Sequence, residues 1–223
     1  MAYSGNNVHL WVATPTWATD LTDHITSLTH GETLSGEVRT HYQKKYEEAL
    51  YLRNVLTVSF DMNRGDNSLP MDLFVQRGTM PMVGWAWHGE RCEWGQFAPE
   101  SHGLNAPRDI STNTITWRQA RDAWRGTSFT PFTINATNTQ ETLDKPLTSG
   151  QDYLVVVTEN VGSVSKTLRV ANGQNVGQWT AGQTGWKTRP QSDRAGSAIT
   201  TTTPLSGNNS ISGFFVAGTK VGV

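Results

Sequence analysis

The sequence predicts a mainly β fold with one or two short helices, on the strength of three observations. Gly, Pro and Asn recur at short intervals along most of the 223 residues, which favours strands joined by turns. Residues 55–62 alternate between apolar and polar side chains, as a half-buried strand does. From residue 126 onward the chain reads as strands and turns alone.

The strand at 55–62 and the helix predicted at 69–77 supply the candidate core. Ser68 can cap that helix, Pro70 lies in its first turn, and Gly78 follows its last turn. The apolar residues predicted to be buried are Leu56, Val58, Phe60, Leu73 and Phe74. The polar residues predicted on the opposite, wet face of the strand are Thr57, Ser59 and Asp61.

The middle of the chain alternates between elements. Residues 80–88 read as a strand, with Trp85 and Trp87 on one face. Residues 89–113 contain prolines and several glycines and read as a loop-rich stretch. A second short helix is predicted at 115–125, where Trp117, Ala120 and Trp124 recur at helical spacing.

The remaining elements are strands. Asn172-Gly173 is a typical hairpin turn between two of them. The predicted C-terminal strands are 153–158, 164–170, a strand after Asn172-Gly173, 197–202 and 210–217.

Residues 33–54 differ from the rest because charge is concentrated there. Tyr42, Tyr46 and Leu50 fit one face of a helix, whereas an extended charged loop that orders against a partner fits equally well. The charged residues considered for such contacts are Glu37, Arg39, Lys44, Lys45, Glu47 and Glu48.

Composition excludes several classes of protein. A formal net charge of −1 argues against a basic nucleic-acid binder. The single cysteine, Cys92, excludes an internal disulfide and any zinc site of paired cysteines. The N-terminus lacks a secretory pattern, and the longest apolar runs, near 154–157 and 214–217, are too short for a membrane helix. We therefore expect synthesis in the cytoplasm and no membrane insertion.

Catalytic and cofactor chemistry is not apparent in the sequence. The set His88, Cys92 and His102 lacks the tight spacing of zinc ligands, as do the histidines of the N-terminal third. The acid pair Glu90 and Glu93 reads as a solvated face rather than a glycosidase pair. We expect no catalytic residues, no metal, no cofactor and no enzyme activity.

Nine tryptophans admit two interpretations. They could stack on sugar rings at a surface, or they could fill a thin core and anchor subunit interfaces, which is the favoured interpretation. The tryptophans that cluster in sequence are Trp85, Trp87, Trp94 and Trp117.

Two short segments in the first 90 or so residues carry a family resemblance. One runs from Asp20 through Leu21, Thr22 and Asp23 to Ile25-Thr26-Ser27, and the other is Leu52-Arg53-Asn54 with its following strand. With these two motifs, the first 90 or so residues resemble the N-terminal half of the major tail tube proteins of long-tailed bacteriophages. The loop between the motifs departs from the family pattern, and residues 126–223 match nothing in it.

The resemblance implies a fold, an assembly and a location. The fold would be two packed antiparallel sheets with a flanking helix, as one tail-tube-like domain over residues 1–223, in which 126–223 is an enlarged half or an added β module. Six copies would form a ring, and stacked rings would form the virion tail through which double-stranded DNA passes without specific binding. The chain would assemble in the host cytoplasm and contact the tape measure, terminator and distal tail proteins. Thr57, Ser59 and Asp61 would face the channel, and the charged 33–54 segment would reach the next ring.

A different class of function stays open at this point. The chain could be a capsid decoration protein or a tail-attached carbohydrate-binding β-sandwich, using the Trp-rich middle or the C-terminal half as its binding face. A cell-wall-degrading enzyme is disfavoured, because no catalytic constellation is apparent.

The facing of strand 55–62 can be tested by comparing two truncations. Phe60→Ala should lower the free energy of unfolding by about 3–5 kcal/mol, because it removes a large core side chain. Thr57→Ala should cost far less, since that face is already wet. Denaturant melts of both variants check the assignment, and the reverse order of stabilities would contradict it.

Overall fold

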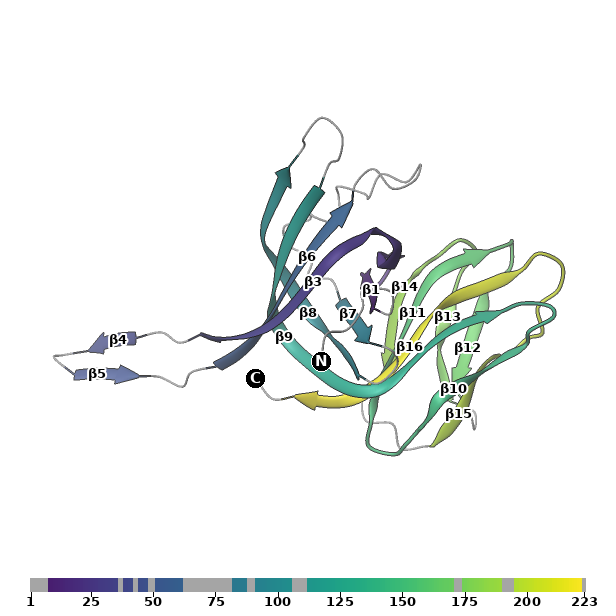
Figure 1. The fold of residues 1–223 in the computed structure, drawn as a ribbon. Coiled ribbons are helices and arrows are strands. Elements are labelled where there is room, and N and C mark those ends of the chain that lie inside the picture. The colour runs from purple at the N-terminus through teal and green to yellow at the C-terminus, as the bar shows by residue number, and fades with distance from the viewer. Residues whose placement is uncertain are drawn as a thin grey trace. The chain divides into compact units, whose positions relative to one another are not determined.

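The computed structural model describes residues 8–35, 38–41, 44–47, 51–61, 82–87, 91–105, 112–170, 174–189 and 195–221. These residues form a mainly β protein of antiparallel sheets, as predicted (Figure 1). Their only helical element is a 3₁₀ turn at Thr22–His24. None of the described residues forms a helix that could cross a membrane.

The strands fall into two compact units, and β8 and β9 contribute residues to both. Unit 1 comprises 1–22, 81–95 and 124–221, and unit 2 comprises 23–80, 96–123 and 222–223. The strands in chain order are β1 (Val8–Ala13), β2 (Ala18–Asp20), β3 (Ile25–Ser35), β4 (Val38–His41), β5 (Lys44–Glu47), β6 (Tyr51–Asp61), β7 (Met82–Trp87), β8 (Arg91–Asn105), β9 (Thr112–Ile134), β10 (Gln140–Leu147), β11 (Asp152–Val161), β12 (Lys166–Val170), β13 (Gln174–Trp179), β14 (Gly185–Arg189), β15 (Gly196–Thr201) and β16 (Ser210–Val221).

Unit 1 packs a long sheet against a short one. The long sheet has the strand order β14-β11-β16-β9-β8-β7-β1-β2, and the short sheet has the order β10-β15-β12-β13. The long sheet curls, so that the Trp186 amide of β14 donates to the Thr14 carbonyl, just after β1, at 3.0 Å. It does not close into a barrel.

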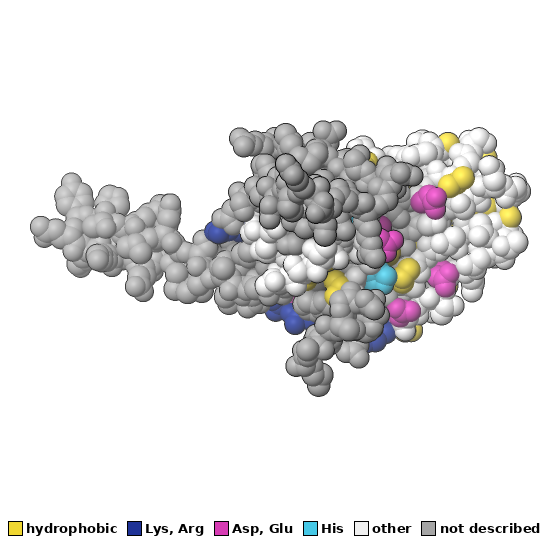
Figure 2. Space-filling model, turned by 45° about the horizontal axis from the view of Figure 1, so that its top comes forward, with side chains coloured by type: hydrophobic (Ala, Val, Ile, Leu, Met, Phe, Trp, Pro, Cys, Tyr) yellow, Lys and Arg dark blue, Asp and Glu magenta, His cyan; other side chains and the backbone are white. Residues whose placement is uncertain are grey.

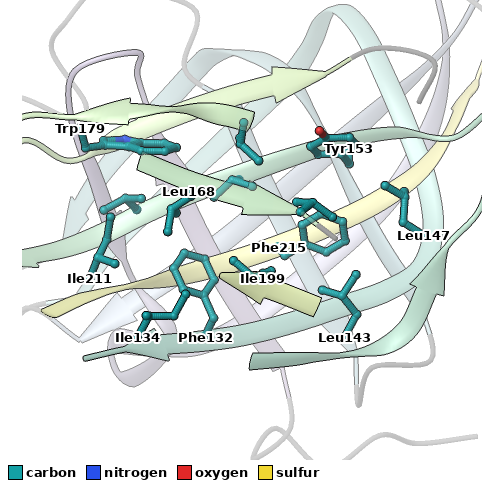
Figure 3. Packing of buried hydrophobic residues seen from close by; sticks show 14 of the residues in the cluster. Phe132, Ile134, Leu143, Leu147, Tyr153, Leu168, Trp179, Ile199, Ile211 and Phe215 are labelled. Atoms are coloured by element: carbon teal, nitrogen blue, oxygen red, sulfur yellow. The ribbon is translucent and has the colours of Figure 1, made fainter. Parts of the chain in front are cut away.

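Strands β11 and β16 lie at the centre of unit 1 and are buried on both faces. Residues 152–157 and 213–218 are all buried. One face supports a cluster between the two sheets, where side chains from both sheets point into the same space (Figure 3). That cluster includes Phe132, Leu143, Tyr153, Leu168, Trp179, Ile199 and Phe215. The opposite face supports a second cluster, which includes Trp11, Ala86, Trp94, Phe129, Leu154 and Phe214.

Each edge strand of the short sheet has a backbone group that bonds to a side chain from another strand. At one edge, the Arg189 guanidinium donates to the Asn175 carbonyl of β13 at 3.1 and 3.2 Å. At the other edge, Thr130 Oγ1 accepts from the Asp144 amide of β10 at 2.9 Å. These bonds attach the edges of the short sheet to β14 and β9 of the long sheet.

Unit 2 contains an antiparallel sheet with the strand order β3-β6-β9-β8. The pairing of β3 with β6 runs from Ile25↔Phe60 to Ser35↔Tyr51, with a bulge between Ile25 and Ser27. The pairing of β6 with β9 is shorter, covering only Val55 to Asp61 of β6. Strands β4 and β5 pair with each other as a separate two-stranded sheet.

Two of the expected elements are wrong. The expected helix at 115–125 lies in strand β9, where buried Ile115 and Trp117 alternate with half-buried Thr114 and Thr116. The helical spacing of Trp117, Ala120 and Trp124 is therefore misleading. The β-branched residues of this segment favour a strand, which pairs with a neighbouring strand on each side. The expected loop at 89–113 contains β8, because neighbouring β7 and β9 override its local Pro and Gly signals.

The helical reading of the charged 33–54 segment is also wrong. The segment contains the end of β3, both strands β4 and β5, and the start of β6. Extended backbone, which was the competing reading, is what the described part of the segment adopts. The charged side chains do not demand a helix, because a two-stranded ribbon leaves both of its faces in water.

Other expectations are confirmed or lie outside the described residues. The strands expected at 55–62, 80–88, 153–158, 164–170, 197–202 and 210–217 correspond to β6, β7, β11, β12, β15 and β16, and β13 is the strand expected after Asn172-Gly173. The predicted helix at 69–77, with Leu73 and Phe74, and the Asn172-Gly173 turn itself fall outside the described residues.

In unit 1, β1 and β7 approach so closely that residue 84 must be a glycine. Trp11 of β1 lies opposite Gly84 of β7, and a Cβ at residue 84 would lie 1.9 Å from the Trp11 ring. Gly84→Ala should therefore destabilise the protein by about 1–3 kcal/mol through overpacking. Gly177→Ala is the control, because its Cβ would meet the flexible Lys187 side chain, which can move. Denaturant melts should separate the two variants, and equal stabilities would contradict the packing described.

Candidate assembly surfaces

The polar face predicted for strand 55–62 continues over its neighbours in unit 2. Thr57 lies opposite Thr29 of β3 and Thr116 of β9, and Ser59 lies opposite Ser27 and Thr114. Directly opposed residues share one face of a sheet, so the register assembles a hydroxyl-rich surface across three strands. Thr57 Oγ1 and Thr116 Oγ1 lie 3.3 Å apart, which places both side chains on this face.

Sequence reasoning found one row of this surface and missed the other two. Asp61 lies opposite Thr112, and Ser27 and Thr29 are exposed. In β9, Ile115 and Trp117 are buried on the opposite face, although the sequence predicts a helix at 115–125. What could not be read was that 112–116 pairs with 57–61, since the two segments are more than fifty residues apart. Arg118 ends the row, opposite Val55.

The charged segment forms a two-stranded arm. Among the described residues, the pairs Glu32↔Asn54 to Ser35↔Tyr51 and Val38↔Glu47 to His41↔Lys44 have a single partner strand each. Arg39 lies opposite Tyr46, and Lys45 lies opposite Thr40. The described register therefore places no acidic residue of β4–β5 directly opposite a basic one. Glu37 and Glu48 fall outside the described residues.

The first family-like motif forms the turn that follows β2. Asp20 Oδ1 accepts from the Thr22 amide at 2.9 Å and from Thr22 Oγ1 at 2.5 Å. Thr22 Oγ1 also accepts from the Leu10 amide of β1 at 3.2 Å, and Leu21 is fully buried. Asp20 and Thr22 suit this turn because the short carboxylate of Asp20 and the hydroxyl of Thr22 accept hydrogen bonds from nearby backbone amides.

Glu93 contradicts the interpretation of the acid pair as a solvated face. Its carboxylate is buried in unit 1, where it accepts hydrogen bonds from Arg91 and lies 3.1 Å from Arg125 Nε. Two partly exposed guanidinium groups pair with one buried carboxylate, which is an arrangement that holds β8 to β9. Glu90 falls outside the described residues.

Lys166 is a second buried charge that sequence reasoning missed. Its ammonium donates to Asn160 Oδ1 at 2.7 Å and to the carbonyls of Val161 at 2.8 Å and Val164 at 3.3 Å. Burial lowers the pKa of Lys166 from its ordinary value of 10.5. All three partners are uncharged, so this lysine fastens the loop between β11 and β12 rather than forming an ion pair.

The aromatic residues support the interpretation that tryptophans fill the core. Trp94 and Trp117 are 1% exposed, so neither can be part of a sugar-stacking surface. The Trp94 ring stacks on Trp124 with centroids 4.1 Å apart. Trp124 Nε1 donates to Asp152 Oδ2 at 2.5 Å. The side chains of Trp85 and Trp87 are not described.

Cys92 has the surroundings of an inert thiol. It is buried in unit 1, where Sγ lies 3.2 Å from the Ser128 carbonyl oxygen. Burial raises the pKa of Cys92 from 9.0 to about 12, so little of the reactive thiolate exists at neutral pH. Within the described part of the chain, no three His, Cys, Asp or Glu residues are grouped to hold a metal ion.

Comparison with known proteins finds no matching family model and no matching curated relative. Two solved structures resemble the chain at 9% sequence identity each. One is a chain of the virion of a native gene transfer agent particle, with a TM-score of 0.38 over 55% of this chain and 97% of that chain. The other is the SPP1 Dit protein, described as a paradigm of the hub adsorption apparatus in phages that infect Gram-positive bacteria, with a TM-score of 0.31 over 92% of this chain and 98% of that chain. Both TM-scores lie below 0.5, so neither likeness establishes a shared role.

Proposed function

We propose that this chain is a structural, non-enzymatic virion protein, the major tail tube subunit of a long-tailed bacteriophage. Six copies form a ring, the rings stack, and the genome leaves through the central channel. The two sequence motifs at 20–27 and 52–62 support the family. The first motif begins in the turn after β2, and Leu52-Arg53-Asn54 lies within β6 together with the strand that was expected to follow it. The observation that carries the assembly role is the two-stranded arm.

The arm lacks what an independent β structure needs. A lone two-stranded ribbon is marginally stable in water, and three strands or a packed face are required for stability. Strands β4 and β5 pair only with each other among the described residues. A second copy of the chain supplies the missing contacts in the proposed stack. Arg39, Lys44 and Lys45 then find acidic partners on the next ring rather than directly across their own ribbon.

The hydroxyl face of unit 2 is the proposed channel lining. Thr57, Ser59 and their neighbours on β3 and β9 offer neutral oxygen atoms, and Asp61 adds a negative charge. A channel that conducts DNA must not hold phosphates, because each basic contact adds electrostatic affinity. A neutral or acidic lining satisfies this requirement. The tape measure, terminator and distal tail proteins are the remaining partners in this proposal.

Electron microscopy of concentrated purified protein tests the function directly. Negatively stained samples should contain hollow tubes with a regular axial repeat. Monomers or isolated trimers at every concentration and salt condition tried would overturn the proposal. The capsid decoration role is the alternative that such a result would favour.

Replacing residues 37–48 with a Gly/Ser linker of equal length should abolish tube formation and leave a folded, soluble chain. The arm makes no described pairing with other strands, so its loss should not unfold the sheets. The matched control replaces residues 148–151, the exposed β10–β11 turn, in the same way and should still form tubes. Hydrogen exchange gives a second measurement, because β4 and β5 amides should exchange fast before assembly and slowly after it. Tubes of normal yield from the arm variant would contradict the role.

The combined change Thr57→Lys and Ser59→Lys should slow DNA ejection while leaving assembly intact. Two lysines in each of six copies would give every ring a band of positive charge that attracts DNA phosphates. The control carries Thr57→Asn and Ser59→Asn, which keep the face neutral. Ejection is followed by the fluorescence of a DNA-binding dye after triggering. Normal speed and extent in the lysine particles would rule out this face as the channel lining.

A further inference from the structure

At one end of the unit 1 sandwich the connecting loops contain no charged residue, although Glu141 at the start of β10 accepts a hydrogen bond from Asn138 at 3.1 Å. Strands β9, β11, β13 and β15 end there, and β10, β12, β14 and β16 begin there. No acidic, basic or histidine residue occurs in the four connecting loops, 135–139, 162–165, 180–184 and 202–209. Figure 2 shows this end on the right, with no blue or magenta at its tip. We call it the uncharged end.

Hydrogen bonds hold these loops in place. In the 162–165 loop, the Lys166 ammonium donates to the carbonyls of Val161 and Val164. In the 180–184 loop, the carbonyls of Thr180 and Gln183 accept from Asn160 Nδ2 at 2.6 and 2.9 Å. Asn135 Oδ1 accepts from the amides of Thr137 at 2.8 Å and Asn138 at 2.7 Å. The uncharged end is thus a preformed surface, and a ligand would have little loop ordering to drive.

A surface cavity of about 260 Å³ lies between two of the loops. Its lining comes from 135–137 on one side and 207–210 on the other. The polar side chains of the lining are Asn135, Thr137, Asn208, Asn209 and Ser210. Asn209 Oδ1 packs against Gly162 of the neighbouring loop, where an added Cβ would lie 2.2 Å from it. Asn209 Nδ2 donates to the Ser206 carbonyl at 2.7 Å, so the Asn209 amide helps to hold the 202–209 loop in place.

We propose that this cavity binds one or two units of an uncharged saccharide. Amide and hydroxyl side chains supply donors and acceptors together, which is what a ring of sugar hydroxyls requires. No lining residue is basic, so phosphate, nucleic acid and acidic sugars find no counter-charge there. The lining also lacks a carboxylate, which a bound divalent cation would need. The cavity is smaller than the roughly 300–1,000 Å³ of sites for drug-sized ligands.

The lining predicts weak binding at each site. No aromatic ring lines the cavity, so the stacking contribution of an aromatic platform is missing. Weak sites become useful when many copies act together, because linked sites raise avidity by factors of about 10²–10⁴. A repeated virion subunit would provide that multiplicity, but the site itself does not depend on the tube proposal.

Saturation-transfer difference NMR of the full-length chain is a suitable test, because it observes the ligand and works for single subunits and assemblies alike. The probes are glucose, galactose, mannose, N-acetylglucosamine and N-acetylgalactosamine, with N-acetylneuraminic acid as the acidic comparison. At least one neutral sugar should give a saturable signal that is unchanged between low and high salt. No saturable signal from any neutral sugar would overturn the proposal, as would a signal confined to the acidic sugar.

A blocking variant locates the binding. Ala136→Trp fills the cavity from an exposed lining position and should reduce the signal at least fivefold. The matched control, Ser149→Trp, adds the same ring to the exposed β10–β11 turn at the opposite end and should leave the signal unchanged. Both variants should melt at the wild-type temperature. An undiminished signal in Ala136→Trp, or equal losses in both variants, would refute the assignment of the cavity. Tube formation is scored separately, so its failure and that of sugar binding are distinguishable.

Discussion

The double burial of the β11–β16 pair is the constraint on which unit 1 depends. Leu154 and Val156 face one cluster, while Tyr153 and Val155 face the other, and all four are fully buried. Strands covered on both faces carry continuous apolar runs instead of alternation. The runs at 154–157 and 214–217, which are too short for a membrane, are explained by this arrangement. A polar side chain at any position of either run would therefore enter one of the two clusters, whereas every second position of an ordinary surface strand can carry a polar side chain.

Charge is distributed in unit 1 so that the loop end stays neutral. Lys166 is buried beneath the loops with three uncharged acceptors, and Glu93 is buried with two guanidinium partners. Removing the guanidinium partners of Glu93 would destabilise the protein, because a buried carboxylate would be left uncompensated. Lys166 fastens the β11–β12 loop, whereas the other three loops are held by neutral amides, since Asn135, Asn160 and Asn209 bind the backbone. The groups that these loops present are therefore mainly neutral amides and hydroxyls.

The sequence correctly predicts the elements whose signals are local. Its predictions are wrong for the elements whose structure depends on strands that are distant in the chain. Alternation identified β6, and turn residues separated the C-terminal strands, because both signals lie within ten residues. The sequence predicts a helix at 115–125, within β9, and a loop at 89–113, where β8 lies. Both predictions are wrong because strand pairing with other segments of the chain determines the structure there. The same limit applied to the sites. Thr57 could be placed on a wet face, but its neighbours Thr29 and Thr116 could not be named. The buried state of Glu93 was also hidden, because Arg125 lies 32 positions further along.

The arm and the uncharged end differ in their polar groups, which are mainly charged in the arm and mainly neutral at the uncharged end. The arm carries lysine and arginine on a ribbon with no third strand, so its contacts strengthen with opposite charge and weaken with salt. The uncharged end is held by internal hydrogen bonds, and its polar groups are amides and hydroxyls whose interactions salt does not screen. In the proposed stack, the contacts of the charged arms should therefore weaken as the ionic strength rises. Contacts made by the uncharged end would persist through such changes, so the two surfaces can act independently on one chain.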